Sequence, residues 1–286
     1  MTVADAARRA KHRGWLVGRQ VRHTAIALRD RTYRAADRVR PPRWTPGAYG
    51  GTFLDTEVPE GQEPLRALPH RLFVLWTGDN ELTPNRQAAL EEIRAQQAGL
   101  DVVLVDPDSL ASWVVPSHPL NSAYTNLSLV HRSDYLRAYL MHHHGGAYCD
   151  LKRGYGDVAA CVRRLEASTG QWALGYREVS SQHAAFTPGL LGKALRRHHG
   201  LLIGGSAFVV RPHTALTTRW MSEVERRLDV FAPALEESPG GVWGDTDGYP
   251  VPWGDLLGAV FQPLCLKHHD RVLADSRMMP AFEGFR

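Results

Sequence analysis

The segment with the clearest chemical potential places an acid and a base two residues apart, directly after a pair of glycines. In "GGAYCDLK", residues 145–152, Asp150 and Lys152 end a short run of alternating apolar and polar residues. Successive side chains of a β-strand point to opposite faces, so this pattern predicts a strand with Tyr148, Asp150 and Lys152 on one face. Because α/β folds bind ligands at the carboxyl ends of their strands, the charged face indicates a site for a charged ligand.

The residues before the glycines predict a helix that leads into this strand. Leu136 and Leu140 follow helical spacing, and the glycines at 145–146 predict its end, since glycine readily takes the left-handed conformation there. Asp134 and Arg137 are three residues apart and therefore share one face of the helix. They are candidates to bind a ligand together; the alternative is a helical ion pair without a ligand.

The surrounding segments predict an α/β domain. Residues 70–78, "HRLFVLWTG", contain a continuous apolar run that suits a buried parallel strand, and residues 101–106 contain another. Between them, residues 83–99 begin with Thr-Pro and end at a glycine, as helices often do. A later strand is expected over 202–210. Strand, helix and strand in this order predict parallel βαβ units within a domain at 69–286.

The amino-terminal region differs from this domain in its charge. Residues 1–43 hold 12 Lys and Arg against three Asp, a net charge of +9, whereas the rest holds 22 against 27, a net charge of −5. Apolar residues scattered among the arginines predict a basic helical arm at 1–44, followed by a linker at 45–68. Such a helix can lie on an anionic membrane; the alternative is that it packs on its own acidic body.

Composition limits the class of protein. The 286 residues, 43% hydrophobic and 22% charged, are typical of a globular protein with a substantial core. The sequence contains no run of about 18 apolar residues, no secretory-type apolar core and no paired cysteine framework. We therefore expect a cytoplasmic location, at the inner face of the membrane if the arm binds lipid. The acidic body argues against a nucleic-acid partner.

These segments together resemble a known family of enzymes. "RSDYLRAYLMHHHGGAYCDLK", residues 132–152, is similar to the signature of the glycosyltransferases that carry a sugar-binding region with a DxD motif. That group includes family 32 mannosyltransferases, capsular polysaccharide synthesis proteins and glucosylating clostridial toxins. Residues 70–78 resemble the first strand of the family, and residues 249–264 resemble a carboxy-terminal segment of its capsule-synthesis branch. The resemblance covers about residues 69–270, in three pieces in the same order. The matching signature residues are Ser133, Asp134, Arg137, Gly145, Gly146, Tyr148 and Asp150.

The resemblance implies a GT-A-like, Rossmann-related fold and a site for a nucleotide sugar, UDP- or GDP-linked. It implies that Trp76, with Thr77, contacts the nucleobase, and that Asp134 and Arg137 hold the sugar, ribose or diphosphate. Tyr148 and Asp150 complete this site. The alternatives are that Trp76 is a core aromatic residue and that Asp150 and Lys152 form a paired strand edge.

One position departs from the family pattern, because Lys152 stands where the second acid of the DxD motif is expected. Two acids spaced in this way would hold a divalent cation, Mn²⁺ or Mg²⁺, which neutralises the leaving diphosphate. Three hypotheses follow. Lys152 contacts the diphosphate directly, Asp150 holds the metal with a ligand from the carboxy-terminal region, or the activity has been lost. His268, His269 and Asp270 are the candidates for that late ligand.

Two further segments have open interpretations. His142, His143 and His144 are consecutive in a helix and fan out about 100° apart, so they are expected to cap the negative end of the helix dipole rather than bind one ion. Residues 238–250 are rich in glycine and contain a tryptophan, which fits either a lid over the donor or an exposed loop.

The sequence thus predicts a glycosyltransferase with catalytic residues Asp150 and Lys152. The resemblance implies transfer to a glycan or lipid-linked hydroxyl acceptor in the synthesis of surface polysaccharide or glycoconjugate, with retention at the anomeric carbon. A sugar-phosphate nucleotidyltransferase is the alternative enzyme, although the segment after the first strand lacks a glycine- and basic-rich loop. A non-catalytic basic protein that binds membranes or nucleic acid is the alternative outside enzymes.

Overall fold

The computed structural model describes residues 3–56, 67–244 and 246–282, and within the first 18 residues it describes the side chain of Trp15 alone. The described α-helices are α1 (Val3–Val39), α2 (Pro84–Gln96), α3 (Leu129–His143), α4 (Val158–Glu166), α5 (Gly189–Arg197), α6 (Ala215–Glu237) and α7 (Gly258–Lys267). The strands are β1 (Arg71–Leu75), β2 (Asp101–Val105), β3 (Gly146–Cys149), β4 (Ala173–Arg177), β5 (Ile203–Val210) and β6 (Val272–Ala274). Short 3-10 helices are η1 (Phe53–Asp55), η2 (Leu110–Trp113), η3 (Ser122–Asn126), η4 (His199–Leu201), η5 (His269–Arg271) and η6 (Ser276–Met278).

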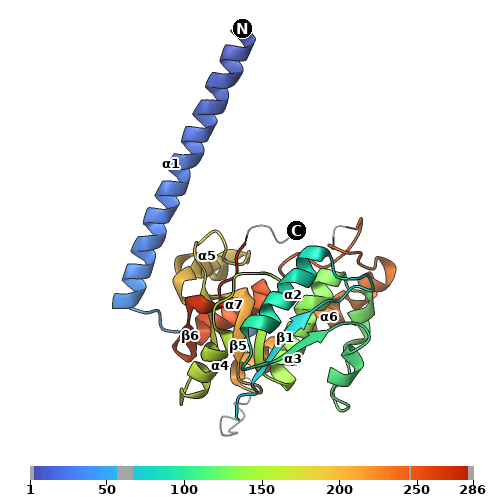
Figure 1. The fold of residues 1–286 in the computed structure, drawn as a ribbon. Coiled ribbons are helices and arrows are strands. Elements are labelled where there is room, and N and C mark those ends of the chain that lie inside the picture. Colours follow the sequence, from blue (N-terminus) through green and yellow to red (C-terminus); the bar gives the residue numbers. More distant parts are fainter. Residues whose placement is uncertain (1–2, 57–66, 245, 283–286) are drawn as a thin grey trace.

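The described strands form one six-stranded sheet in the order β2-β1-β3-β5-β4-β6. β1 pairs in parallel with β2 and β3, and β4 pairs in parallel with β6. β5 is antiparallel to both of its neighbours. The predicted α/β class with a mostly parallel sheet flanked by helices is confirmed, and the sheet is compatible with a Rossmann-like fold (Figure 1).

Helices cover both faces of this sheet. Alternate residues of its strands are therefore buried on opposite sides. Phe73 and Phe208 belong to the core that the sheet shares with α3, α6 and α7. Val74 and Ala207, their neighbours along the strands, belong to the core shared with α2 and α4. Two buried layers therefore hold β1, β3 and β5 rigidly between them.

The glycine pair between α3 and β3 is required by its surroundings. Gly145 and Gly146 have φ angles of +65° and +98°, in the region that side chains rarely adopt. A Cβ on Gly145 would lie 2.4 Å from the Pro212 ring, and one on Gly146 would lie 2.9 Å from the Arg71 carbonyl oxygen. The pair thus ends α3, as the sequence predicted, and lets β3 pass directly beside β1.

The arm expected over residues 1–44 forms α1, which stands away from the sheet and its covering helices (Figure 1). Its carboxy-terminal half is fixed to the body by acidic residues as well as by Arg29 and Arg34, which donate to Ser181 and to the Val179 carbonyl. Asp30 accepts hydrogen bonds from the Ser180 hydroxyl at 2.8 Å and the Ser181 backbone at 2.9 Å, and Asp37 pairs with Arg197 at 2.9 Å. Two apolar side chains of the described part of the arm, Val21 and Leu28, are exposed. No described helix is both long and apolar enough to cross a bilayer.

The segment expected to be a linker, residues 45–68, contains a packed element. Leu54 in η1 is completely buried. The Lys267 ammonium donates to its carbonyl oxygen at 2.7 Å, and the Arg219 guanidinium donates to Phe53 and Thr56 carbonyls. Residues 52–56 therefore belong to the body of the protein, and residues 57–66 lie outside the described residues.

Candidate functional site

The candidate site lies where β1 and β3 end. Asp150 directly follows β3, and its backbone N–H donates to the Ser206 carbonyl of β5 at 2.8 Å. Trp76 directly follows β1, the neighbouring parallel strand. The carboxyl edge of the sheet therefore brings together residues that are 74 positions apart in the sequence, at the place where α/β sheets bind ligands.

The Asp150 carboxylate is held by three side chains. Its Oδ2 accepts a hydrogen bond from the Lys152 ammonium at 2.8 Å, and its Oδ1 accepts one from the Tyr148 hydroxyl at 2.7 Å. The Arg137 guanidinium approaches Oδ1 to 3.3 Å. β3 ends at Cys149, so the strand predicted to continue to Lys152 is too long. A tight turn, in which the Lys152 N–H donates to the Asp150 carbonyl at 2.7 Å, brings the two charges together instead.

Arg137 connects α3 to the strand ends. Its Nη1 lies 3.4 Å from Asp134 Oδ1 and donates to the Gly205 carbonyl at 3.3 Å. Its guanidinium also lies over the Tyr148 ring, 4.8 Å from the centroid. The Nε–H is buried and has no acceptor among the described residues. The predicted pair Asp134–Arg137 is present, and Arg137 extends it to Asp150.

Burial and charge act on these groups in opposite directions. Burial alone would raise the pKa of Asp150, but the adjacent Arg137 and Lys152 cations lower it below its ordinary value. Burial raises the pKa of Asp134, which Arg137 offsets only in part. Burial also raises the pKa of the Tyr148 hydroxyl well above its usual range. Asp150 is therefore ionised at neutral pH, and Tyr148 is a hydrogen-bond donor.

Trp76 and Thr77 lie at the adjoining edge. The Trp76 indole N–H donates to the Asn80 carbonyl at 2.6 Å, and its half-buried ring packs against the core on the α2 side. The Thr77 hydroxyl donates to the Leu129 carbonyl at the start of α3, at 2.6 Å. These bonds fix the segment after β1 against α3, which leaves the Trp76 ring as an oriented, partly open aromatic surface at the same carboxyl edge of the sheet as the charged cluster.

The structure does not bring His268, His269 or Asp270 to Asp150. They lie just before Val272, the first residue of β6. Val272 pairs with Ala173 of β4, which pairs with Val210 of β5, and Val210 pairs in turn with Gly146. The three candidates therefore lie level with the amino end of β3. Asp150 lies beyond the opposite end of that strand. The His268 ring packs against Trp172, with the centroids 5.0 Å apart. Since the two groups lie at opposite edges of the sheet, a shared metal ion is ruled out, and this late-ligand hypothesis is corrected.

The histidines at the end of α3 also differ from expectation. Burial, reinforced by neighbouring histidines, lowers the pKa of His142 to about 3 and that of His143 to about 4. Both rings are therefore neutral near pH 7 and do not supply the positive charge expected at a helix end. They pack with His213, whose centroid lies 4.7 Å from that of His142, and His144 bonds to the Trp113 carbonyl. The cluster fills space at the far end of α3.

The loop over residues 238–250 is fixed beside the site in its described part. The Tyr249 hydroxyl accepts from the Ser128 backbone at 3.2 Å and lies 2.8 Å from His131 Nδ1. The Leu129 N–H, in the same turn of α3 that holds Thr77, donates to Gly241 at 3.0 Å. The loop therefore forms a wall next to the Trp76–Thr77 segment, while its Trp243 is exposed.

The sequence did not identify several site residues. Ser206 of β5 accepts a hydrogen bond from the Lys152 ammonium at 3.1 Å, and Tyr155 donates to the Asp150 carbonyl at 3.1 Å. The Phe282 ring lies 5.2 Å from the Lys152 ammonium. These residues belong to no recognisable sequence motif, and they lie near Asp150 only because the chain folds back on itself. The structure is therefore needed to identify them.

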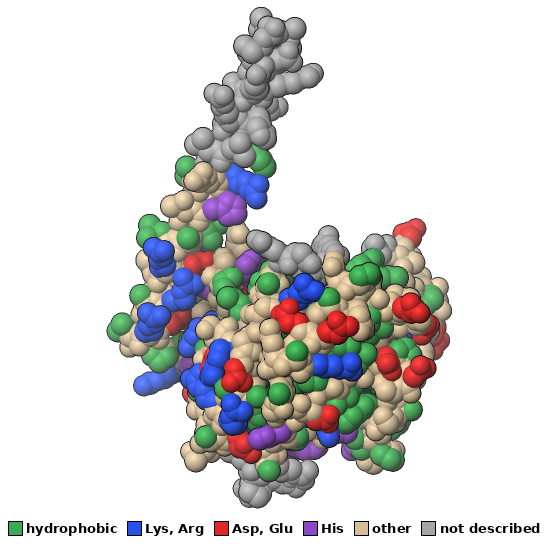
Figure 2. Space-filling view, viewed as in Figure 1, with side chains coloured by type: hydrophobic (Ala, Val, Ile, Leu, Met, Phe, Trp, Pro, Cys, Tyr) green, Lys and Arg blue, Asp and Glu red, His purple; other side chains and the backbone are tan. Residues whose placement is uncertain are grey.

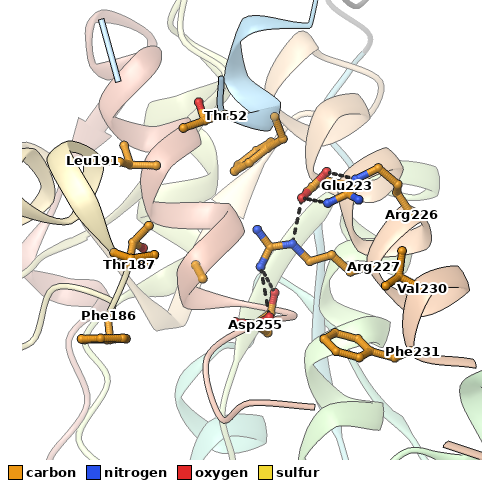
Figure 3. Close-up of a pocket in the computed structure, with 13 residues that line it drawn as sticks. Thr52, Phe186, Thr187, Leu191, Glu223, Arg226, Arg227, Val230, Phe231 and Asp255 are labelled. Carbon is orange, nitrogen blue, oxygen red and sulfur yellow. Dashed lines mark hydrogen bonds and ion pairs between the residues drawn. The ribbon is translucent and has the colours of Figure 1, made fainter. Parts of the chain in front are cut away.

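A separate cavity of about 480 Å³ lies between η1, α5, α6 and α7. Figure 3 shows Arg227 between Glu223 and Asp255 in this pocket. The Arg227 guanidinium donates to Glu223 at 2.8 Å and to the Asp255 carbonyl at 2.7 Å. Its lining residues include none of the cluster around Asp150. The contacts of Arg227 with Glu223 and Asp255 fix α6 to the segment before α7.

The donor set around Asp150 is a poor fit for a divalent cation. Hard cations prefer several carboxylate, carbonyl or water oxygens, yet both oxygens of Asp150 face cationic or hydroxyl donors. Among the residues described, no cluster of three or more His, Cys, Asp or Glu side chains has metal-binding geometry. What the site offers is a fixed carboxylate with two adjacent cations, which suits a ligand that carries both hydroxyl groups and negative charge.

Comparison of the sequence with known proteins identifies no relative of this chain, since neither a protein-family model nor a curated protein sequence matches it. The functional interpretation therefore depends on the residues at the carboxyl edge of β1 and β3, and on the sequence resemblance of the segments that form it.

Proposed function

We propose that this protein is a glycosyltransferase that moves a sugar from a nucleotide sugar to a hydroxyl acceptor, on a GT-A-like version of the α/β fold. The observation that carries the proposal is the position of Asp150. It lies at the carboxyl end of a buried strand, ionised between Arg137 and Lys152, at the same edge of the sheet as Trp76, which follows the neighbouring parallel strand. An acid, two cations and an aromatic surface are what a ribose, a diphosphate and a nucleobase require.

The residues divide naturally between the parts of the donor. Trp76 offers a ring on which the base stacks, and Thr77 fixes the segment that carries it. Asp150 accepts hydrogen bonds from ribose or sugar hydroxyls, and Tyr148 and Arg137 hold its carboxylate in place. Asp134 orients Arg137 toward the sugar and diphosphate. The acceptor proposed from the resemblance is a glycan or lipid-linked hydroxyl, with retention at the anomeric carbon.

The chemistry requires one bond to break and one to form. The bond between the anomeric carbon and the β-phosphate oxygen breaks, and its electron pair stays on the nucleoside diphosphate. The acceptor oxygen bonds to the anomeric carbon, and the hydroxyl proton passes to the departing diphosphate or to water. Negative charge therefore grows on the diphosphate, where positioned cations stabilise the transition state more than the ground state.

Release of nucleoside diphosphate from a panel of UDP- and GDP-sugars tests this proposal, with polysaccharide and lipid extracts as acceptor sources. We expect one donor to be consumed, with a glycosylated product of the corresponding added mass. Formation of a nucleotide sugar from a sugar phosphate and a nucleoside triphosphate, with no transfer, would instead establish the nucleotidyltransferase alternative.

Trp76→Ala is expected to weaken donor binding by about 1–3 kcal/mol, the range for stacking of one base on an aromatic side chain. Trp76→Phe, which keeps an aromatic face, is expected to retain most of the affinity. Calorimetric titration of both variants with the donor measures the effect. Unchanged affinity in a Trp76→Ala protein of normal melting temperature would return Trp76 to a purely structural role.

The exposed half of α1 is proposed to hold the protein near a lipid-linked acceptor. Figure 2 shows basic side chains on the described part of α1. Arg19 and Arg22 are exposed there, with Val21 between them. Each basic residue near an anionic surface contributes about 1 kcal/mol, so replacing both arginines with glutamine should weaken vesicle binding about 30-fold.

Cosedimentation with vesicles of anionic and of zwitterionic lipid, at low and high salt, measures this binding. Arg94→Gln with Lys193→Gln removes two exposed charges from the body and is the matched control. Equal sedimentation of the arm variant, the control and a protein that begins at Thr45 would exclude a membrane role for the arm.

A further inference from the structure

Four charged side chains meet at the carboxyl edge of β3 and neutralise one another. Arg137 lies 3.4 Å from Asp134 and 3.3 Å from Asp150, and the Lys152 ammonium lies 2.8 Å from Asp150. Two carboxylates and two cations give a formal charge of zero. The pKa of Asp134 is raised by burial, which shifts the balance further toward positive charge. Among the residues that the structure describes, this cluster therefore has no surplus negative charge with which to attract a divalent cation.

The positions of the donors lead to the same conclusion. A cation bound to Asp150 would sit at about 2.0–2.6 Å from a carboxylate oxygen. Oδ2 already accepts from the Lys152 ammonium and Oδ1 from Tyr148, with Arg137 adjacent. A metal ion at Asp150 would thus have to enter between two cations that are already paired with that carboxylate.

We propose that Lys152 and Arg137 together replace the divalent cation, so that sugar transfer by this protein does not depend on metal. The inference rests on the proposed transferase function and specifies how its site works. As the anomeric bond breaks, the electron pair that stays on the β-phosphate oxygen is stabilised by the Lys152 ammonium, a compact point charge, and by the planar Arg137 fork. Asp150 holds the Lys152 ammonium in position through its ion pair, and its carboxylate also accepts a hydrogen bond from a hydroxyl group of the nucleotide sugar.

The surroundings of Lys152 suit this role. Its ammonium makes a second hydrogen bond, to the Ser206 hydroxyl at 3.1 Å, which a phosphate oxygen can replace without leaving a charge unpaired. The side chain is largely buried but 12% exposed, so it is partly accessible from solvent. In a site that excludes most water, one such charge acts strongly on a developing anion.

The first test measures turnover after complete chelation with EDTA. Wild-type protein is expected to retain its turnover, and Lys152→Met is expected to lose about 10²–10³-fold in kcat with a smaller change in KM, as for removal of a group that stabilises developing charge. Lys152→Arg, which keeps the charge, should recover part of the loss. Lys193→Met, which removes an exposed lysine of α5, should behave as wild type. The proposal would be overturned if wild-type turnover vanished with EDTA and returned with Mn²⁺, and if Lys152→Met had the same turnover as wild type at each Mn²⁺ concentration.

The second test measures binding of Mn²⁺ alone, by electron paramagnetic resonance, and needs no substrate. Wild-type protein is expected to bind Mn²⁺ no more tightly than Asp150→Asn does. Lys152→Asp, which supplies the second acid, is expected to bind it at least tenfold more tightly. Tight binding by wild type that Asp150→Asn abolishes would overturn the proposal. If no donor is turned over under any condition, the transferase function fails, whereas the Mn²⁺ result still decides whether the site excludes metal.

Discussion

Asp150→Asn should abolish sugar transfer while the protein remains folded. The substitution keeps the size of the side chain and one acceptor oxygen, but it removes the negative charge that pairs with Arg137 and Lys152. The donor hydroxyls then lose a charged acceptor with two oxygens, and the Lys152 ammonium is no longer held toward the diphosphate. We expect kcat/KM to fall by at least about 10³-fold, because binding and positioning are lost together.

Turnover and thermal unfolding are measured on the same preparations. Asp108→Asn, an exposed acid in the segment after β2, is the matched control and should leave both unchanged. A folded Asp150→Asn protein with near wild-type kcat/KM would remove Asp150 from the site, and with it the reason to place the donor at the end of β3.

Arg137→Met should have the second-largest effect, on both stability and transfer. Arg137 is the group that compensates Asp134, which is buried, and it also pairs with Asp150. Removing one partner of a buried ion pair leaves an uncompensated charge and costs about 3–5 kcal/mol. Urea unfolding should show this loss, and transfer should fall with it because the diphosphate loses one of its two cations.

The pH dependence of the same variant provides a sharper check. Without Arg137, burial raises the pKa of Asp134 further, because the largest opposing charge is gone and only the weaker effect of His131 remains. An acid whose folded pKa is raised destabilises the folded state when ionised, so stability should rise as pH falls through that pKa. Arg137→Met should therefore lose less stability than wild type, or gain some, between pH 7 and pH 5. Replacing Asp134 with asparagine as well should remove this difference; a double variant with the same pH dependence would assign it to another group.

The sequence predicted the elements whose signals are local. Continuous apolar runs gave β1 and β2, and the pair at Gly145 and Gly146 gave the turn from α3 into β3. The Thr-Pro start gave the beginning of α2, but the helix ends at Gln96, before the predicted end at Gly99. Each depends on residues within one element, so an isolated segment contains the necessary information. The pairing of Asp134 with Arg137 was equally accessible, because it follows from helical spacing.

The remaining parts of the site depend on contacts across the chain. Alternation predicted that Lys152 would share a strand face with Asp150, but β3 ends at Cys149 and a turn joins the two charges. Ser206 reaches Lys152 only because β5 runs antiparallel beside β3. His268 was placed near Asp150 because it follows the segment that resembles the family's carboxy-terminal part, whereas it lies before β6, at the opposite end of the strands from Asp150. Sheet order and direction are tertiary properties that no local pattern contains.

Calorimetric titration of the wild-type protein with a panel of nucleotide sugars, in EDTA and in Mn²⁺, tests the central assignment most directly. We predict saturable binding of one UDP- or GDP-sugar, of equal affinity in both solutions, that Asp150→Asn weakens and Asp108→Asn does not. Binding of no nucleotide sugar by the folded protein, or binding that Asp150→Asn leaves unchanged, would contradict a donor site at the carboxyl edge of β1 and β3.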